Sequence, residues 1–259
     1  MMSDLLSVKR IYNESISEIT LGPAPANIIS EAMIGELLAQ IEKDENDTDC
    51  RGIILVGSGD NFSFGASVEE HTASRVGQML PQFHLLIEKV LACSIPVMAK
   101  VSGNCLGGGF ELALACHFVF ADKSAKFAVP EIKLGVFPPP ACALLSSKIG
   151  EGIANEMIIT GGTKSAEDLY HAGLVNHLCE DAAAIDEKLA PFIEKQINRT
   201  SASSLRFATR AARLVVVKRY RNNIKDLESL YLNDLMSSND ANEGIQSFIE
   251  KRRATWTNS

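Results

Sequence analysis

The chain has 259 residues and an acidic balance, since 25 Lys and Arg stand against 32 Asp and Glu and the formal net charge is −7. An apolar share of 46% excludes a disordered chain, and the length predicts one large domain, with or without a short appendage. The acidity argues against nucleic acid or an anionic membrane surface as a partner. Because no apolar stretch approaches about 20 residues and residues 1–15 lack a signal-peptide pattern, we expect a cytoplasmic protein without a membrane span.

The first part of the chain predicts strands on either side of one amphipathic helix. Residues 8–22 alternate loosely and predict one or two short strands. Ser30 is a good N-cap, and apolar residues follow it at helical spacing: Ile34, Leu37, Leu38 and Ile41. The acidic residues 44–49 predict a solvated loop, and GIILVG (52–57) predicts a strand buried on both faces.

The middle of the chain alternates between predicted helices and strands. Apolar spacing predicts a helix over residues 79–90, and VMAKVSG (97–103) predicts the next strand. Three glycines then precede an apolar helix, FELALAC (110–116), and FVFAD (118–122) and AKFAVPEI (125–132) extend the strand pattern. This order predicts parallel strands joined by right-handed crossovers.

Helical patterns dominate from Ile149 onward, interrupted by GLVNHL (173–178). The last ~60 residues predict helix throughout. Within them Arg206, Arg210 and Arg213 stand at helical spacing, which favours a solvated basic face over a phosphate site. An α/β core followed by a helical C-terminal segment is therefore expected.

The cysteines and histidines show no metal-binding pattern. The six cysteines are scattered singly, and the histidines lack the spacing of a zinc motif. The cysteines are Cys50, Cys93, Cys105, Cys116, Cys142 and Cys179. We expect reduced, mostly buried thiols and no bound metal.

A glycine-rich turn, LGGGFE (106–111), lies between a predicted buried strand and a helix. Glycines there allow a ligand to approach the backbone, and N–H groups at a helix N-terminus suit an anion or a developing oxyanion. A tight turn without a ligand explains the pattern equally well. A dinucleotide site of the Rossmann type and a P-loop nucleotide site are excluded, because neither GxGxxG nor GxxxxGK[ST] is present. No GxSxG motif supports a serine hydrolase.

Glu111 and Glu131 each interrupt an otherwise apolar segment. Two carboxylates that face one cavity can act as general acid and general base on a water molecule. The alternative for each is a structural role, as a cap or as the partner of a nearby lysine such as Lys126 or Lys133. Taken singly, each glutamate favours the structural role.

Five motifs occur in a specific order and spacing: FSFGASVEE (62–70), IPVMAKVSGNCLGGGFELALAC (95–116), AKFAVPEIKLGVFP (125–138), GGTKSAEDLYHAGLVNHL (161–178) and NEGIQSFIEKRRA (242–254). Together they resemble the crotonase family, the enoyl-CoA hydratase/isomerase superfamily, over essentially the whole chain. The resemblance implies an α/β fold, with a spiral of ββα turns over residues 1–195 and a helical trimerisation segment over residues 196–259. It also implies a homotrimer or a dimer of trimers.

The resemblance further implies a CoA-thioester hydratase, a hydro-lyase. The backbone N–H groups of Ala66 and Gly108 would form the oxyanion hole for the thioester carbonyl. Glu111 and Glu131 fall on the positions of the paired glutamates of hydratases. No cofactor is implied, because CoA is part of the acyl-CoA substrate.

The remaining implied contacts concern the acyl pocket and CoA. Phe64, Pro138, Pro139 and Pro140 would line the pocket, and three prolines would make a stiffer wall than the glycine-rich stretch common in the family. The CoA contacts implied are Ala26, Ser67, Val68, Phe248 and Lys251, the last two toward a neighbouring subunit. Glu69 stands where hydratases often carry a lysine, which is a departure from the usual phosphate contacts.

Two segments, FGASVEEH and VFPPPA, resemble a group within the family, the cyclohexa-1,5-dienecarbonyl-CoA hydratases of anaerobic aromatic degradation. The implied reaction gives 6-hydroxycyclohex-1-ene-1-carbonyl-CoA. Two alternatives remain open. One is a general enoyl-CoA hydratase or isomerase of fatty-acid oxidation, and the other is a non-catalytic family member that acts as a binding module.

Overall fold

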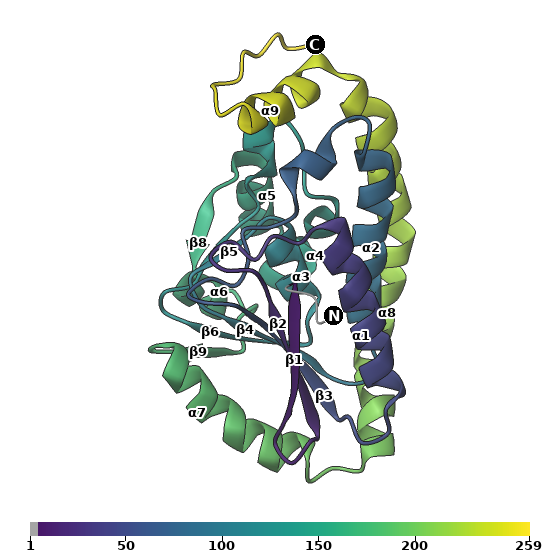
Figure 1. Cartoon of the computed structure of the whole chain (residues 1–259), viewed down its shortest axis with the longest axis vertical. Helices are drawn as coiled ribbons and strands as arrows, with labels where there is room; N and C mark the ends of the chain where they lie inside the picture. The colour runs from purple at the N-terminus through teal and green to yellow at the C-terminus, as the bar shows by residue number, and fades with distance from the viewer. Residues whose placement is uncertain (1–4) are drawn as a thin grey trace.

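A six-stranded sheet forms the centre of the molecule (Figure 1) in the computed structural model, which describes residues 5–259. The strands, in sheet order, are β1 (Leu6–Ile11), β2 (Ile16–Leu21), β3 (Gly52–Gly57), β4 (Val97–Val101), β6 (Phe118–Asp122) and β9 (His177–Cys179). From β2 onward all neighbours are parallel, as predicted, whereas β1 pairs with β2 as an antiparallel hairpin.

β3 lies inside this sheet and is covered on both faces, which confirms the interpretation of its uninterrupted apolar sequence. Ile53 and Leu55 belong to the main core, and Ile54 between them belongs to a second apolar cluster on the opposite face. All three side chains are at most 1% exposed. The alternation of side chains along a strand therefore connects two cores through one strand.

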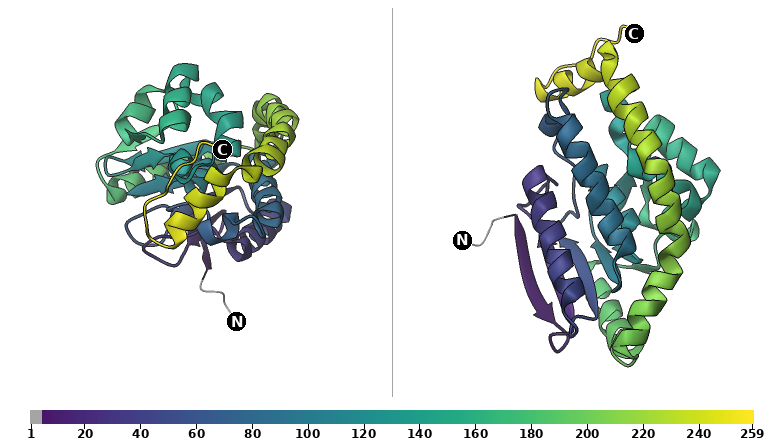
Figure 2. Two further views of the ribbon diagram at one scale, coloured as in Figure 1. Left: turned by 90° about the horizontal axis from the view of Figure 1, so that it is seen from above. Right: turned by 90° about the vertical axis from the view of Figure 1, so that its right-hand side faces the viewer.

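Nine α-helices cover the sheet and extend beyond it, within the part of the chain that the structure describes. They are α1 (Glu31–Asn46), α2 (Val76–Ala92), α3 (Gly108–Ala115), α4 (Pro139–Ile149), α5 (Glu151–Thr160), α6 (Ala166–His171), α7 (Ala182–Phe192), α8 (Ala202–Ser229) and α9 (Asn239–Ile249). Helices α1, α2 and α8 run side by side (Figures 1 and 2). α7 packs on β6 and β9, and α9 lies at the far end beside the C-terminus.

Shorter segments complete the helical part. They are the 3₁₀ turns Val68–His71, Pro130–Leu134 and Leu235–Ser237 and the π-helical segments Ile193–Ile197 and Leu230–Asp234. The predicted start of α1 is confirmed, because the Ser30 hydroxyl accepts a hydrogen bond from the N–H of Met33 at 3.3 Å.

A second, three-stranded sheet brings two segments of the candidate site together. It contains β5 (Asn104–Leu106), β7 (Lys126–Ala128) and β8 (Thr163–Ser165), with β5 and β7 parallel. The strand expected over residues 125–132 ends at Ala128, because Pro130 lacks an N–H and the chain turns into the 3₁₀ segment that carries Glu131. β5 leads into α3, so the register of this small sheet sets the two glutamates against each other.

The expectation of a solvated loop for the acidic residues 44–49 is wrong at its start. α1 continues to Asn46, and Asp44 is fully buried. The Arg10 guanidinium on β1 lies 3.1 Å from Asp44 and 2.6 Å from Asp47, so the first of these carboxylates is paired inside the protein rather than hydrated.

The interpretation of a solvated basic face on α8 is also wrong for two of its three arginines. Arg206 donates 2.7 Å hydrogen bonds to the carbonyls of Glu45 and Asp47, which end α1. Arg213 is buried and donates to the carbonyl of Cys116. Both arginines therefore satisfy backbone carbonyls far away in the sequence, and Arg210 alone of the three stays exposed.

The prediction that the last ~60 residues are helical throughout fails at the end of the chain. α9 ends at Ile249, and residues 251–259 return across it without helix. The Asp240 carboxylate accepts from the N–H of Thr257 at 2.7 Å and from that of Asn258 at 2.8 Å, so the tail is fixed to the start of α9.

The six cysteines are unpaired and five of them are buried, as predicted. Among residues 5–259, no helix combines the length and the apolar character that crossing a membrane would require.

Candidate active site

A compact cavity of about 90 Å³ lies where α3, the 3₁₀ turn Pro130–Leu134 and the start of α4 meet the segment 64–71. It is mostly apolar. The predicted site residues that line it are Phe64, Ala66, Val68, Gly108, Glu111, Glu131, Pro138 and Pro139. The structure thus brings together residues from four separate parts of the sequence.

The glycine-rich turn is required by close approaches on both of its sides. Gly107 has a φ of +50°, and a Cβ there would lie 2.8 Å from Oε1 of Glu131. A Cβ on Gly109 would lie 2.6 Å from the Ser63 Cβ. Glycines therefore let the start of α3 pack directly against the Glu131 carboxylate on one side and the loop at Ser63 on the other.

The loop that carries Ala66 is held against β5 and the segment before α1. The N–H of Ile29 donates to the Gly65 carbonyl at 2.9 Å, and the N–H of Ser67 donates back to the Ile29 carbonyl at 3.3 Å. A Cβ on Gly108 would lie only 3.1 Å from the Ala66 nitrogen, so the two predicted oxyanion donors are neighbours. Among the hydrogen bonds of residues 5–259, none uses the N–H of Ala66. This arrangement can hold a carbonyl oxygen.

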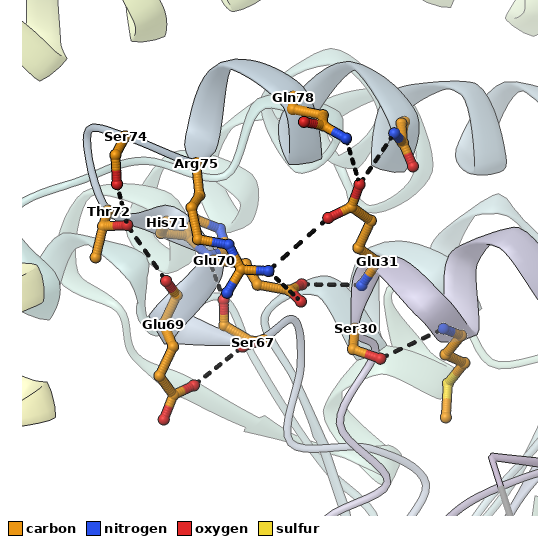
Figure 3. Close-up of polar contacts among 12 residues, drawn as sticks. Ser30, Glu31, Ser67, Glu69, Glu70, His71, Thr72, Ser74, Arg75 and Gln78 are labelled. Carbon is orange, nitrogen blue, oxygen red and sulfur yellow. Dashed lines mark hydrogen bonds and ion pairs between the residues drawn. The ribbon is translucent and has the colours of Figure 1, made fainter.

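The buried Glu70 carboxylate fixes the same loop through polar contacts with neighbouring helices (Figure 3). Glu70 lies between Arg75 and the start of α1, accepting from the N–H of Glu31 at 2.9 Å and from the Arg75 guanidinium at 3.1 Å. The Glu31 carboxylate in turn accepts from Gln78 at 2.7 Å. The loop is thus joined to the N-termini of both α1 and α2, which fixes the position of Ala66.

Glu111 is 4% exposed and has one hydrogen bond from the backbone. Its Oε1 accepts from the N–H of Ala141, in the first turn of α4, at 2.9 Å. The structural role expected as the alternative for Glu111, that of a helix cap, is therefore partly confirmed, because its carboxylate caps the N-terminus of α4, a helix distant in the sequence. The same side chain also lines the cavity, so both roles belong to one residue.

Glu131 has fewer hydrogen-bond partners than Glu111. Its Oε2 is buried without a hydrogen-bond partner among the described residues, and neither Lys126 nor Lys133 pairs with it. An unpaired buried carboxyl group is costly unless it is protonated or has a function. The lysine-pairing alternative is wrong for Glu131.

Burial raises the pKa of both carboxyl groups. The pKa of Glu131 rises to about 7. The pKa of Glu111 rises well above its ordinary range, first through burial and then through the charge of Glu131, although the Ala141 N–H opposes the shift. Two carboxyl groups that face each other in one low-dielectric cavity do not both ionise readily, so at neutral pH the pair holds at least one proton. One carboxylate and one carboxylic acid in one cavity can perform acid–base chemistry.

Several cavity residues were not predicted from the sequence. They are His71, Leu80, Phe83, Val136, Phe137, Tyr231 and Ile245. Most of them come from α2, the π-helical segment Leu230–Asp234 and α9, where helical apolar spacing indicates core as readily as a pocket wall. His71 donates its Nδ1–H to the Ser67 carbonyl at 2.7 Å, and burial lowers its pKa, so the neutral ring keeps Nε2 as an acceptor.

Other predicted residues lie outside the cavity lining: Ala26, Ser67, Pro140, Phe248 and Lys251. Ser67 is nearly buried and donates to Glu69 at 3.0 Å. Pro140 is buried within the first turn of α4, behind Pro138 and Pro139. Phe248 is 54% exposed on α9, and Lys251 follows at its end. Among the described residues, no three or more His, Cys, Asp or Glu side chains form a group that could hold a metal ion.

The family model described as enoyl-CoA hydratase/isomerase matches residues 12–259. The chain belongs to this family. It is 38% identical to the cyclohexa-1,5-dienecarbonyl-CoA hydratase of Thauera aromatica over 260 residues, covering 99% of this chain and 100% of the relative. A probable enoyl-CoA hydratase of Bacillus subtilis is 33% identical, with 95% of this chain and 97% of the relative covered.

Solved structures agree with the family assignment. An enoyl-CoA hydratase from Mycobacterium avium superposes with a TM-score of 0.84 at 25% identity, covering 99% of this chain and 100% of the other. The α/β fold and the helical C-terminal segment expected from the sequence are therefore those of enoyl-CoA hydratases.

Replacing Glu131 with Gln should stabilise the protein increasingly as pH rises. The pKa of Glu131 is about 7 when folded against an ordinary value of 4.5, so wild-type stability is lost between these values as the buried group ionises. The gain in unfolding free energy from Glu131→Gln should therefore grow by about 2 to 3 kcal/mol from pH 5 to pH 8, measured by urea unfolding.

Glu187→Gln is the matched control, because Glu187 is exposed on α7 far from the cavity. Its effect should stay the same at both pH values. A Glu131→Gln effect that is equally constant would show that this carboxyl group is not buried in the folded protein.

Proposed function

We propose that the protein is a hydro-lyase that adds water to an α,β-unsaturated acyl-CoA thioester. The observation that carries this proposal is a pair of carboxyl groups in one cavity, the buried Glu111 and Glu131 with its buried Oε2, beside the N–H groups of Ala66 and Gly108. Family membership and the hydratases among its relatives support the same reaction class. No cofactor takes part in this proposal, because CoA belongs to the substrate.

In this mechanism the two backbone N–H groups bind the thioester oxygen and stabilise the negative charge that develops on it. Glu131, whose Oε2 has no hydrogen-bond partner among the described residues, takes a proton from water as the water oxygen bonds to the β-carbon. Glu111 gives its proton to carbon and collapses the enolate. The Ala141 N–H then stabilises the Glu111 carboxylate, and proton exchange restores the pair.

The substrate that we propose is cyclohexa-1,5-diene-1-carbonyl-CoA. The Thauera aromatica relative carries this activity in its name, and the Pro138–Pro139 wall with Phe64 and Phe83 makes a compact pocket suited to a flat ring. Hydroxide would bond to the β-carbon and leave a dienolate, and protonation of its remote ring carbon would complete a 1,4-addition. The product is 6-hydroxycyclohex-1-ene-1-carbonyl-CoA, consistent with a role in aromatic compound degradation.

The second candidate is a general enoyl-CoA hydratase that acts on linear substrates. The identity to the probable enoyl-CoA hydratase of Bacillus subtilis favours it. A non-catalytic binding module is the less favoured alternative, because such a protein has no use for two carboxyl groups that line one mostly apolar cavity.

We also propose that residues 196–259 form an oligomerisation segment, in a homotrimer or a dimer of trimers in the cytoplasm. Phe207, Leu214 and Val215 on α8 are between 66% and 72% exposed, which supports a covering partner. In such an assembly Phe248 and Lys251 would contact the CoA of a neighbouring subunit, while Ala26, Ser67 and Val68 would contact the subunit's own CoA.

Glu111→Gln and Glu131→Gln should each lower the hydration rate at least ~100-fold, because each removes one proton-transfer group and keeps its shape. Binding of the CoA ester, measured by calorimetry, should change little. The exposed Glu187→Gln serves again as the control with normal turnover. Near-normal turnover of either site variant would leave that glutamate with its structural role only.

Gly108→Pro should abolish hydration, whereas Gly108→Ala should retain a measurable rate. Both variants add a Cβ that lies 3.1 Å from the Ala66 nitrogen, but proline alone removes the N–H. Proline is tolerated at the first position of a helix, and the loss of one oxyanion donor costs about 100-fold or more in rate. Equal rates for the two variants would place the oxyanion donor elsewhere.

The substrate is tested by comparing kcat/KM for cyclohexa-1,5-dienecarbonyl-CoA and crotonyl-CoA on the purified wild-type protein. We expect at least a tenfold preference for the cyclic dienoyl thioester, because the proline wall is matched to a ring. A preference for crotonyl-CoA would establish the general hydratase instead. Turnover of neither would favour the binding module.

A further inference from the structure

The first turn of α4 is unusual in how few hydrogen-bond donors it has. A helix normally presents free N–H groups at its first three positions. In α4 these positions are Pro139, Pro140 and Ala141, and the two prolines have no N–H. The next N–H, that of Cys142, already donates to the Pro138 carbonyl at 2.9 Å. Ala141 therefore supplies the one free donor of this turn.

That single donor is directed at a catalytic candidate. The N–H of Ala141, at the third helical position, donates to Glu111 Oε1 at 2.9 Å. A capping oxygen normally accepts from the second or the third position, and here the second is Pro140. Glu111 thus occupies the place of a capping side chain, while the other donor that such an oxygen uses is missing.

Among residues 5–259 no lysine or arginine pairs with Glu111, and burial lowers the pKa of His71, which lines the same cavity, so that its ring stays neutral. Glu131 faces Glu111 from the 3₁₀ turn, and its charge raises the pKa of Glu111. Three further titratable groups interact with the charge of Glu111: Cys142 on α4, Tyr220 on α8 and Tyr231 in the segment Leu230–Asp234. Burial raises the pKa of each, so all three stay neutral near pH 7. The number of backbone donors is therefore the main feature that can stabilise the Glu111 carboxylate.

We propose that Pro140 is a positioning residue: it withholds a second backbone donor from Glu111, so that the single N–H of Ala141 orients the side chain and α4 gives its carboxylate no further hydrogen bond. This inference rests on the proposed hydratase function and explains what the proline tract does there. The stiffness of the tract shapes the pocket at Pro138 and Pro139, whereas Pro140, behind the wall, acts through its missing N–H.

Pro140→Ala tests this by adding one N–H at the second position of a helix that alanine favours. In the pH profile of kcat/KM, the acidic limb reports the ionisation of the first carboxyl group and the alkaline limb that of Glu111. A second hydrogen bond to the carboxylate should move the alkaline limb about one pH unit lower, and the acidic limb much less. Pro191→Ala, which removes an exposed proline from α7, should move neither limb.

Infrared titration of the carboxylic acid C=O band, assigned with Glu111→Gln, separates this inference from the proposed function because it needs no turnover. Ionisation of Glu111 in Pro140→Ala should also occur about one pH unit lower than in wild type. An unchanged titration, or the same shift in Pro191→Ala, overturns the role of Pro140 even if the enzyme is a hydratase. A shifted titration in a protein without hydratase activity would support the role of Pro140 and remove the proposed function.

Discussion

The constraint on which the rest of the structure depends is a pair of carboxyl groups in one cavity, the buried Glu111 and Glu131 with its buried Oε2, which have no cationic partner among residues 5–259. Such a pair cannot ionise fully, and its repulsion and desolvation must be balanced by stable packing elsewhere. The two cores on either side of the sheet, joined through β3, provide that stability. The two carboxyl groups therefore repel each other, but the packed cores hold them in fixed positions. This fixed geometry allows a proton to be held in a defined place.

In the proposed function, backbone groups of the elements nearest the cavity bind the thioester oxygen. Gly107 and Gly109 allow α3 to approach Glu131 and the loop at Ser63, and Glu70 fixes the loop that carries Ala66. These parts come from distant segments, brought together by the parallel order of β5 and β7. In the proposed mechanism these N–H groups are preorganised for a developing oxyanion, because donors of a folded backbone cannot reorient.

The sequence allowed the fold and the chemical groups to be predicted where a local pattern has a local cause. Ser30 as a cap, the doubly buried β3 and the glycine-rich turn all follow from neighbouring residues. The predictions for Asp44 and Arg213 are wrong, because the partners of these side chains lie far away in the sequence and only the folded chain shows them. The apolar cavity walls could not be separated from core for the same reason, since burial depends on packing between elements.

The proline tract shows most clearly what the structure adds to the sequence. As a motif, Pro138–Pro140 indicates a stiff wall, because proline restricts the backbone. In the fold only the first two residues face the cavity, and the tract is also the beginning of α4, where the missing N–H groups matter more than stiffness. A helix N-terminus normally favours a nearby carboxylate through several donors. Here the prolines reduce these to the single N–H of Ala141, so α4 can orient Glu111 without strongly favouring its ionised form. The same three residues thus serve the shape of the pocket and the acidity of the group inside it.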